Sequence, residues 1–213
     1  MNKEFQKYII QRQNQRPSAP MRMHRQAVLY PRTKERNPWP VFPMPTACTR
    51  AAVRPLADRI IAERGDLLHL YQMLMHSAPI AEGWLTYLTA IRQKSGLSGA
   101  LREMIIMRVA QLNNAPYEAD QHAPIALREG LSQAQLDALS HWTSSALFDA
   151  HQRAVLAYTD AMTRQVQVPD PVFAEVSALF TPEQIVEITA TVAAYNMVSR
   201  FLEALQIHTH DAP

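Results

Sequence analysis

LREMIIMRVAQLNNAPYEADQHAPIALREG, residues 101–130, is the most informative stretch of this chain, because it contains two helical patterns of different character. Over the range 99–113, apolar residues occupy nearly every direction around a 3.6-residue period, which predicts a helix buried on most sides. The turn-forming Asn-Asn-Ala-Pro segment should end it. A second helix is predicted over 117–129, with Gly130 as its C-terminal cap.

The predicted buried helix carries three charged residues, Arg102, Glu103 and Arg108. An unpaired buried charge costs several kcal/mol, so each must be paired, lie at a subunit contact or line a pocket. Glu103 is therefore a candidate site residue on physical grounds alone. Arg108 is either a neighbour of Glu103 or a planar guanidinium that holds a substrate carboxylate.

The second helix carries Tyr117, Glu118 and His122. Glu118 and His122 are four residues apart and project from nearly the same face, which in isolation is most often a surface pair worth about 0.3–0.5 kcal/mol. A carboxylate beside an imidazole also suits general acid or base catalysis near neutral pH. Tyr117 could donate a hydrogen bond to a reacting oxygen, although half-buried tyrosines with a satisfied hydroxyl are common.

These residues carry a family resemblance. The segment 101–132 resembles the signature of the carboxymuconolactone decarboxylase and alkylhydroperoxidase D superfamily, and the resemblance extends over about 67–207. The flanking stretches LLHLYQMLMHSAPIAEGWL and YNMVSRFLEAL are similar to that family's neighbouring helices. The resemblance implies an all-α, compact multi-helix bundle of the alkylhydroperoxidase D-like type. It also implies homotrimers or homohexamers with sites near subunit contacts.

The superfamily that this chain resembles contains two chemistries. In the peroxidase branch, two cysteines separated by two residues begin the second helix, with a glutamate twelve positions before the first and a histidine four positions after the second. The matching positions here are Glu103, Ala115, Glu118 and His122, so both thiols are absent. The decarboxylase branch instead carries a Tyr-Glu pair before the histidine, as this chain does from Tyr117. The resemblance therefore favours the decarboxylase-like branch.

The number of cysteines bears directly on the peroxidase alternative. Thiol peroxidation requires one thiolate that attacks the peroxide and a second thiol that resolves the sulfenic acid. The chain has one cysteine, Cys48, in a proline-rich segment far from the signature. An alkylhydroperoxidase is thus a disfavoured alternative. A third alternative is a non-catalytic oligomeric binding protein, which predicts that Glu103, Glu118 and His122 do not converge on one cavity.

Charge and proline content divide the chain in two. Residues 1–50 contain ten Lys or Arg, two acids and seven of the fifteen prolines, whereas residues 51–213 contain eleven basic and seventeen acidic residues. We expect a basic, proline-rich extension that is poorly ordered, followed by one helical domain at 51–213. Charge without a recognisable motif is weak support for a nucleic-acid partner, and we expect none.

The composition also limits the class of protein. Five glycines in 213 residues and few hairpin signals favour an all-helical fold. No apolar run suits a membrane span or a signal peptide, and one cysteine gives no disulfide framework, which is typical of a soluble cytoplasmic protein. The sequence lacks metal-ligand motifs, a phosphate loop and a dinucleotide fingerprint, so we expect no metal or organic cofactor.

Nine helices are predicted from periodicity and from capping signals such as Ser132 and Thr181. Their ranges are 51–64, 66–76, 79–94, 99–113, 117–129, 132–140, 149–166, 171–180 and 182–206. The last is apolar on more than one side. Together with the buried pattern at 99–113, this suggests that one subunit cannot cover its own apolar surface and that the protein forms oligomers.

We therefore interpret the chain as an enzyme similar to carboxymuconolactone decarboxylases, acting on a small unsaturated lactone or related carboxylic acid. His122 is expected to carry the proton, with Glu118 orienting it and Glu103 acting as a second relay. Arg108 or Tyr117 is expected to stabilise the developing oxyanion. The expected partner is this small-molecule substrate.

Overall fold

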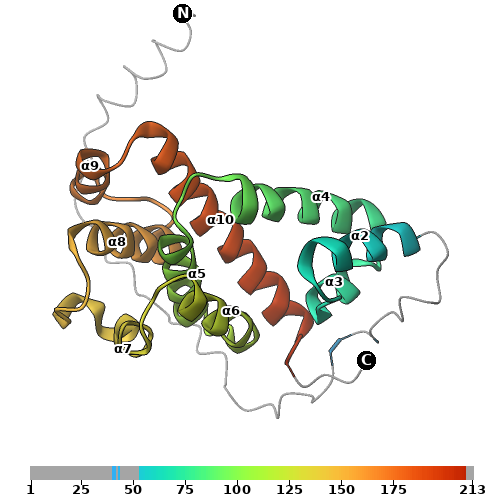
Figure 1. Ribbon diagram of the computed structural model, residues 1–213. Coiled ribbons are helices and arrows are strands. Elements are labelled where there is room, and N and C mark those ends of the chain that lie inside the picture. The colour runs from blue at the N-terminus through green and yellow to red at the C-terminus, as the bar shows by residue number, and fades with distance from the viewer. Residues whose placement is uncertain (1–39, 42, 44–52, 210–213) are drawn as a thin grey trace, which may run out of the picture. The chain divides into compact units, whose positions relative to one another are not determined.

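The computed structural model describes residues 40, 41, 43 and 53–209, and within these ranges it is all-helical, with no strand (Figure 1). The elements are α2 (Arg54–Arg64), α3 (His69–Leu74), α4 (Ala78–Thr89), η1 (Ala90–Lys94), α5 (Gly99–Asn113), α6 (Pro116–Arg128), α7 (Gln133–Ala138), η2 (Leu139–Ser144), α8 (Ala150–Gln165), α9 (Asp170–Leu179) and α10 (Pro182–Leu205). The predicted basic extension at 1–50 and Cys48 lie almost wholly outside the described residues.

The predicted helical ranges agree with the described helices to within three residues at each end, apart from two places where the helix type changes. Residues 51 and 52 of the first range lie outside the described residues. The range 79–94 divides at Thr89, after which η1 continues as a single turn of π-helix. The range 132–140 divides at Ala138, after which η2 continues as a 3₁₀-helix. Single π-helical turns inside or beside an α-helix occur frequently at functional sites.

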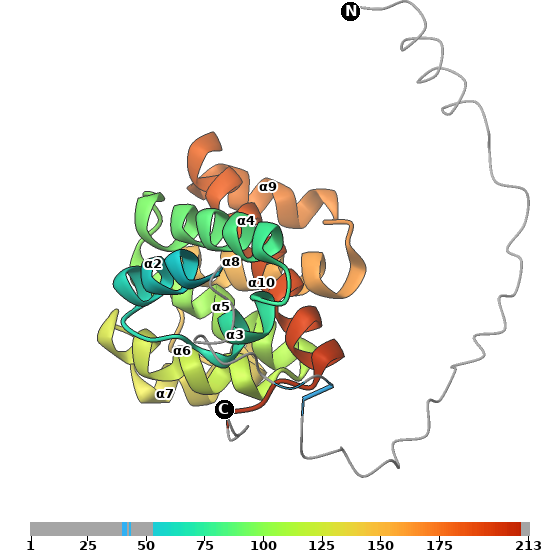
Figure 2. The same cartoon turned by 90° about the vertical axis from the view of Figure 1, so that its right-hand side faces the viewer.

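Helix α5 lies between α6, α8 and α10, as both views show (Figures 1 and 2). Every residue from Arg102 to Ala110 is buried, which confirms the prediction of a helix covered on most sides. The covering helices belong to the same chain. The burial of α5 is therefore no argument for oligomerisation, and the homotrimer or homohexamer stays a prediction from the resemblance.

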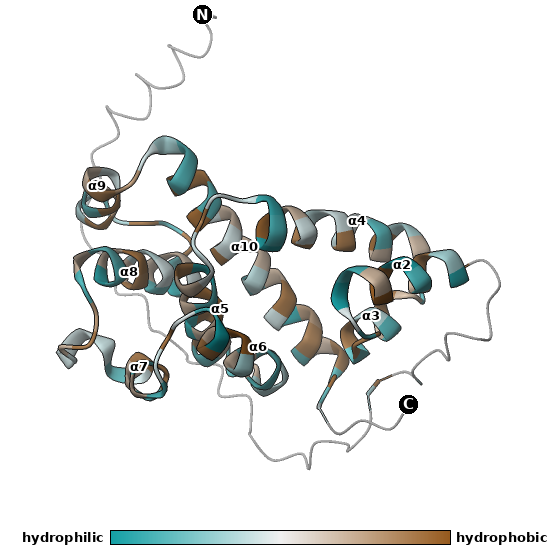
Figure 3. Cartoon of the chain, viewed as in Figure 1, coloured by the Kyte–Doolittle hydropathy of each residue, from teal (hydrophilic) through white to brown (hydrophobic). Residues whose placement is uncertain are grey.

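Helix α10 is the longest element, and hydrophobic residues follow most of its length beyond a hydrophilic first turn (Figure 3). Ile188 and Leu202 are fully buried in the core, where each such side chain contributes ~1.5–3 kcal/mol. Val186 and Met197 stay partly exposed. Among the described helices, neither α10 nor any other combines the length and the apolar character that a membrane span requires.

Capping side chains fix where several helices begin. Ser132 and Thr181 each accept a hydrogen bond from the backbone of the third helical residue, and the glutamine at that position closes the capping box. The box at Thr181 was predicted, whereas for Ser132 only the helix start was predicted. Asp149 and Gln152 form a third box at the start of α8, which the sequence analysis did not predict. The caps hold α8 and α10 in the positions from which they cover α5.

Candidate active site

Helices α5 and α6 bring a carboxylate and an imidazole into contact. His122 Nδ1 lies 2.6 Å from Glu103 Oε2, and both side chains are buried. The turn at Asn114, whose φ is 53°, ends α5 and lets α6 fold back along it. The expected pairing of His122 with Glu118 is not formed, because the Glu118 carboxylate is directed toward α10 instead.

Glu103 is held as an anion. Its other oxygen, Oε1, accepts a 3.2 Å hydrogen bond from Arg102 Nε, and Arg102 also contacts Glu129 at 3.5 Å. Burial alone would raise the pKa of Glu103, but the hydrogen bond from His122 and the positive charges around the carboxylate, among them Arg102 and Arg92, outweigh it and lower the pKa. Glu103 is therefore ionised at neutral pH.

His122 is held as a neutral imidazole. Burial lowers its pKa, and the contact with Glu103 opposes this effect only in part. Because the ionised carboxylate of Glu103 can only accept, Nδ1 carries the proton and Nε2 carries the lone pair. Nε2 has no hydrogen-bond partner in the described part of the chain, and the Tyr195 ring packs edge-on at 5.1 Å between centroids. His122 can thus act as a base through Nε2.

Glu118 is anchored to α10 and is protonated. Its Oε2 accepts a 2.7 Å hydrogen bond from Ser199 Oγ, and its Oε1 is buried without a partner among the described residues. Burial raises the pKa of Glu118 to about 8, with a further increase from the Glu203 charge and a partial decrease from the Ser199 hydrogen bond. At neutral pH its carboxyl group is mostly neutral and can donate a proton.

Glu118 and His122 line one small cavity of about 30 Å³, which we call the inner cavity. The lining residues with polar side chains are Tyr71, Arg92, Tyr117, Glu118, Gln121, His122 and Tyr195. The hydroxyl groups of Tyr71 and Tyr195, like Glu118 Oε1, are buried and have no partner among the described residues. A space of this size holds one water molecule or one oxygen-sized group.

Tyr117, another predicted site residue, forms part of the wall of the inner cavity. Its side chain is buried, and its ring stacks against His69 with 6.2 Å between ring centroids. Tyr117 thus lines the same cavity as His122 and Glu118. Its expected hydrogen bond to a reacting oxygen stays a prediction.

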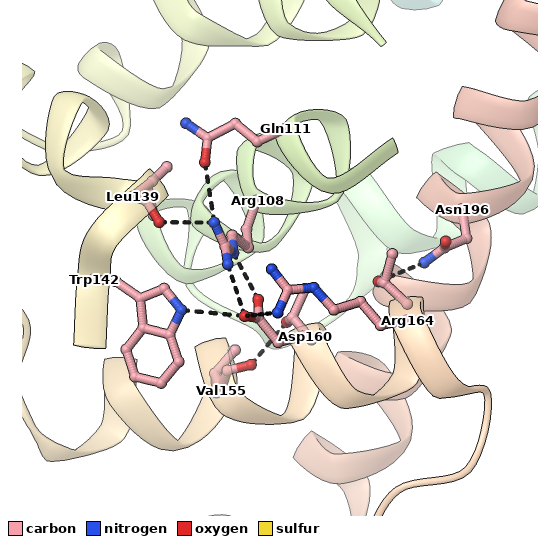
Figure 4. A network of polar contacts seen from close by, with 10 residues as sticks. Arg108, Gln111, Leu139, Trp142, Val155, Asp160, Arg164 and Asn196 are labelled. Carbon is pink, nitrogen blue, oxygen red and sulfur yellow. Dashed lines mark hydrogen bonds and ion pairs between the residues drawn. The ribbon is translucent and has the colours of Figure 1, made fainter. Parts of the chain in front are cut away.

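Arg108 does not line the inner cavity, and its guanidinium group is fully engaged elsewhere (Figure 4). Nε and Nη2 donate to the two carboxylate oxygens of Asp160 at 2.6 and 2.7 Å, and Nη1 donates to the Leu139 carbonyl at 2.9 Å. A hollow of about 520 Å³ lies beside Arg108 and Arg164, but both arginines contact Asp160. The expectation that Arg108 holds a substrate carboxylate is therefore not supported.

Within the described residues, no three His, Cys, Asp or Glu side chains are grouped so that they could hold a metal ion. His69, on α3, and His76, just after it, each contact a backbone carbonyl group instead. His69 Nδ1 lies 3.0 Å from the carbonyl oxygen of His208, and His76 Nε2 lies 3.1 Å from that of Pro43.

Sequence reasoning missed the site residues that other helices contribute. Tyr71 and Tyr195 are indistinguishable from ordinary core aromatics in the sequence. Ser199 carried a usable signal, because a serine on an apolar face of a helix needs a buried partner. Arg92 lies near the end of the predicted helix 79–94 and gave no sign that it would line a cavity together with His122.

Comparison with known proteins supports the family resemblance. The model of the carboxymuconolactone decarboxylase family matches residues 78–161, a region that includes Glu103, Glu118 and His122. Over these residues the chain is similar to this family, and its structural neighbours include a protein described as an alkylhydroperoxidase AhpD core. The resemblance found in residues 101–132 is thereby confirmed.

Proteins similar to this chain carry different names. The uncharacterized protein YnjA of Escherichia coli (strain K12) is 29% identical over 127 residues, which are 59% of this chain and 66% of YnjA. An uncharacterized peroxidase-related protein from Ralstonia eutropha JMP134, an alkylhydroperoxidase AhpD core, has a TM-score of 0.70 at 20% identity, over 82% of this chain and 94% of its own. The debrominase Bmp8 has a TM-score of 0.64 at 18% identity, over 73% of this chain and 84% of its own. The two structural likenesses show a shared fold.

Proposed function

We propose that this chain, which is similar to the carboxymuconolactone decarboxylase family, is an acid–base enzyme that decarboxylates a small unsaturated lactone or related carboxylic acid. The observation that carries the proposal is the 2.6 Å contact between His122 Nδ1 and Glu103 Oε2. It leaves Nε2 of His122 available in a cavity that also contains the neutral carboxyl group of Glu118. A neutral base and a neutral acid of this kind suit proton transfer near pH 7.

Glu103 takes the orienting role in this mechanism. Its carboxylate fixes the Nδ1–H form of His122 and stabilises the imidazolium that forms when Nε2 accepts a proton. The sequence analysis had given this role to Glu118. His122 keeps the role of proton carrier, and Glu118 becomes the acid that supplies a proton within the same cavity.

The proposed reaction replaces a carboxylate on the substrate by a hydrogen atom. The bond between the carboxylate carbon and the ring carbon breaks, carbon dioxide leaves, and the electron pair moves through the conjugated system into the lactone carbonyl. Nε2 of His122 accepts a proton from the Glu118 carboxyl group, and the imidazolium that forms donates it to carbon. Glu118 is then reprotonated from solvent, so that one proton is consumed for each carbon dioxide released.

The inner cavity supplies donors for the oxygen on which negative charge develops. The hydroxyl groups of Tyr71 and Tyr195 are neutral donors without another partner among the described residues. Burial raises the pKa of Tyr195 above its usual value, so its hydroxyl group keeps its proton. Fixed donors stabilise a developing oxyanion without reorganising. They take the role that had been given to Arg108.

The proposal is tested by a screen of unsaturated lactone acids for released carbon dioxide. The wild type is compared with His122→Gln and with His151→Gln, which changes an exposed histidine of α8. We expect release by the wild type and by His151→Gln, and release near background by His122→Gln. Near-normal turnover by His122→Gln would remove the imidazole from the mechanism.

A thiol peroxidase is the second candidate, because the Ralstonia eutropha relative has a peroxidase-related name. The absence of cysteine at Ala115 and Glu118 opposes it. We expect no turnover of an organic hydroperoxide in the presence of a thiol reductant. Turnover that survives Cys48→Ser would show that the thiol argument is incomplete.

A non-catalytic binding protein is the remaining alternative. It predicts that Glu103, Glu118 and His122 are scattered or face solvent. Glu118 and His122 line the inner cavity, whereas Glu103 does not line it and reaches it only through its contact with His122. The burial of all three side chains and the Glu103–His122 contact support an enzyme instead.

A further inference from the structure

A second, larger opening also reaches His122. This opening, which we call the outer cleft, measures about 440 Å³, and its charged lining comprises Glu63, Arg64, Arg92, Arg102, Arg128 and Glu129. Leu68, Arg92, Gln121 and His122 line both the outer cleft and the inner cavity. These four residues form the boundary between the two spaces, and His122 can be approached from the outer cleft.

The outer cleft has an excess of positive charge, with four arginines and two glutamates. Two of the arginines are engaged with neighbouring side chains. Arg102 contacts Glu103 and Glu129, and Arg64 donates a 2.7 Å hydrogen bond to Thr89. The remaining positive charge is available to an anion, because a concave basic surface raises the local concentration of anions.

Arg92 is the arginine placed at the boundary itself. It is half-buried on the π-helical turn η1, and it makes no hydrogen bond or ion pair with any described residue. Burial has the largest influence on the pKa values of Glu103 and His122, and the Arg92 charge also lowers both. A partly desolvated guanidinium that lacks a partner is stabilised when an anion binds.

We propose that Arg92 binds a carboxylate of the substrate in the outer cleft and thereby positions the rest of the substrate against His122. The inference rests on the proposed function, which it deepens by naming the substrate class. That class is a small organic anion that keeps one free carboxylate to bind Arg92, beside the group that reacts. The planar fork of the guanidinium matches a carboxylate through two parallel hydrogen bonds.

The volumes of the inner cavity and the outer cleft agree with a substrate that binds Arg92 in the outer cleft. The inner cavity, at about 30 Å³, holds only an oxygen-sized group, whereas the outer cleft, at about 440 Å³, lies in the range of small-molecule sites. A substrate that binds Arg92 can therefore lie in the outer cleft and direct one oxygen past His122 toward Tyr71 and Tyr195.

Maleate, a small unsaturated dicarboxylate, is the probe for this site. Its binding is measured by calorimetry for the wild type, Arg92→Gln, Arg92→Lys and Lys94→Gln. Lys94 is the matched control, because it is exposed on the same turn and loses the same charge without lining either space. We expect Arg92→Gln to weaken binding at least tenfold and Lys94→Gln to change it less than twofold.

Two further arms define the chemistry. Dimethyl maleate, which is neutral, should not bind, and Arg92→Lys should bind maleate with intermediate affinity because it keeps the charge and loses the fork. Tighter binding of inorganic phosphate than of maleate would overturn the carboxylate assignment. The Arg92→Lys result also decides the matter if Arg92→Gln does not fold.

Equal affinity of the wild type and Arg92→Gln for maleate, or no binding by the wild type, overturns the proposal. Failure of the proposed function has a different signature. Arg92-dependent maleate binding without carbon dioxide release from any lactone acid would leave the anion site standing and remove the decarboxylase. Carbon dioxide release by Arg92→Gln with an unchanged KM would support the decarboxylase and remove the anion site at Arg92.

Discussion

Glu103 and His122 lie 19 positions apart in the chain, and their side chains meet at 2.6 Å between Oε2 and Nδ1. The contact joins the first half of α5 to the middle of α6, and both side chains are buried. Ionised Glu103 and neutral His122 form a unit in which one group holds a charge and the other is ready to accept a proton.

Glu103→Gln should damage catalysis without a large effect on folding. The amide keeps the shape of the carboxylate but removes its charge, and its NH₂ group can donate to Nδ1 and stabilise the wrong tautomer of His122. We expect kcat to fall about 100-fold or more, with a smaller change in KM. Glu175→Gln, at an exposed carboxylate of α9 that lines neither the inner cavity nor the outer cleft, is the control. A Glu103→Gln enzyme as active as the control would show that the carboxylate charge is dispensable.

Glu118→Gln should remove a pH dependence of stability. The pKa of Glu118 is raised from 4.5 to about 8 in the folded protein, so between these values the folded state binds more protons than the unfolded state. Wild-type stability should therefore fall relative to Glu118→Gln as pH rises from 4.5 to 8, by a few kcal/mol in total. Urea midpoints across this range measure the difference, with exposed Glu175→Gln as the control. Parallel curves for the wild type and Glu118→Gln would contradict the raised pKa.

Ser199→Ala should shift the same titration upward. Ser199 Oγ donates a 2.7 Å hydrogen bond to Glu118 Oε2. This hydrogen bond lowers the pKa of Glu118, which burial raises. Without the hydroxyl group, the pH-dependent loss of stability should extend above pH 8, and the protein should be destabilised by ~1–3 kcal/mol at neutral pH. Ser199→Thr, which can keep the donor, is the matched variant. An unchanged pH profile in Ser199→Ala would mean that the hydroxyl does not act on Glu118.

Arg108→Gln should affect stability rather than binding. Asp160 and Arg108 form a bidentate ion pair between α8 and α5, with Arg108 only 5% exposed. Loss of the guanidinium leaves the carboxylate in a largely buried position, which costs ~3 kcal/mol. Arg164→Gln, at a side chain 58% exposed on the same carboxylate, should cost less than ~1 kcal/mol. Thermal melting separates the two variants, and weaker maleate binding by a folded Arg108→Gln would restore Arg108 as a ligand residue.

The sequence predicted the helices well, because each is marked by features within its own residues. The all-round apolar pattern of 99–113 predicted a buried helix, and the signals at Ser132 and Thr181 placed the starts of α7 and α10. The π-helical turn at 90–94 has no comparable local signal. Residues 90–94 were therefore predicted as part of an ordinary helix, and the π-helical turn that carries Arg92 was missed.

The site was predicted as a set of residues but not as a set of contacts. Helical spacing relates Glu118 to His122 on one helix, whereas the Glu103–His122 contact depends on how α5 and α6 cross. Arg108 was expected to need a partner or a ligand, but Asp160 lies 52 positions away on α8. Contacts of this kind follow from the packing of helices, which no short stretch of sequence contains.

The protonation state of His122 tests the central claim most directly. Nitrogen-15 NMR of the imidazole distinguishes the Nδ1–H form, the Nε2–H form and the imidazolium, and comparison with His122→Gln assigns the signals. The Glu103 contact and the lowered pKa of His122 predict a neutral ring at pH 7 with the proton on Nδ1 and the lone pair on Nε2. An imidazolium, or a ring with its proton on Nε2, would contradict the account.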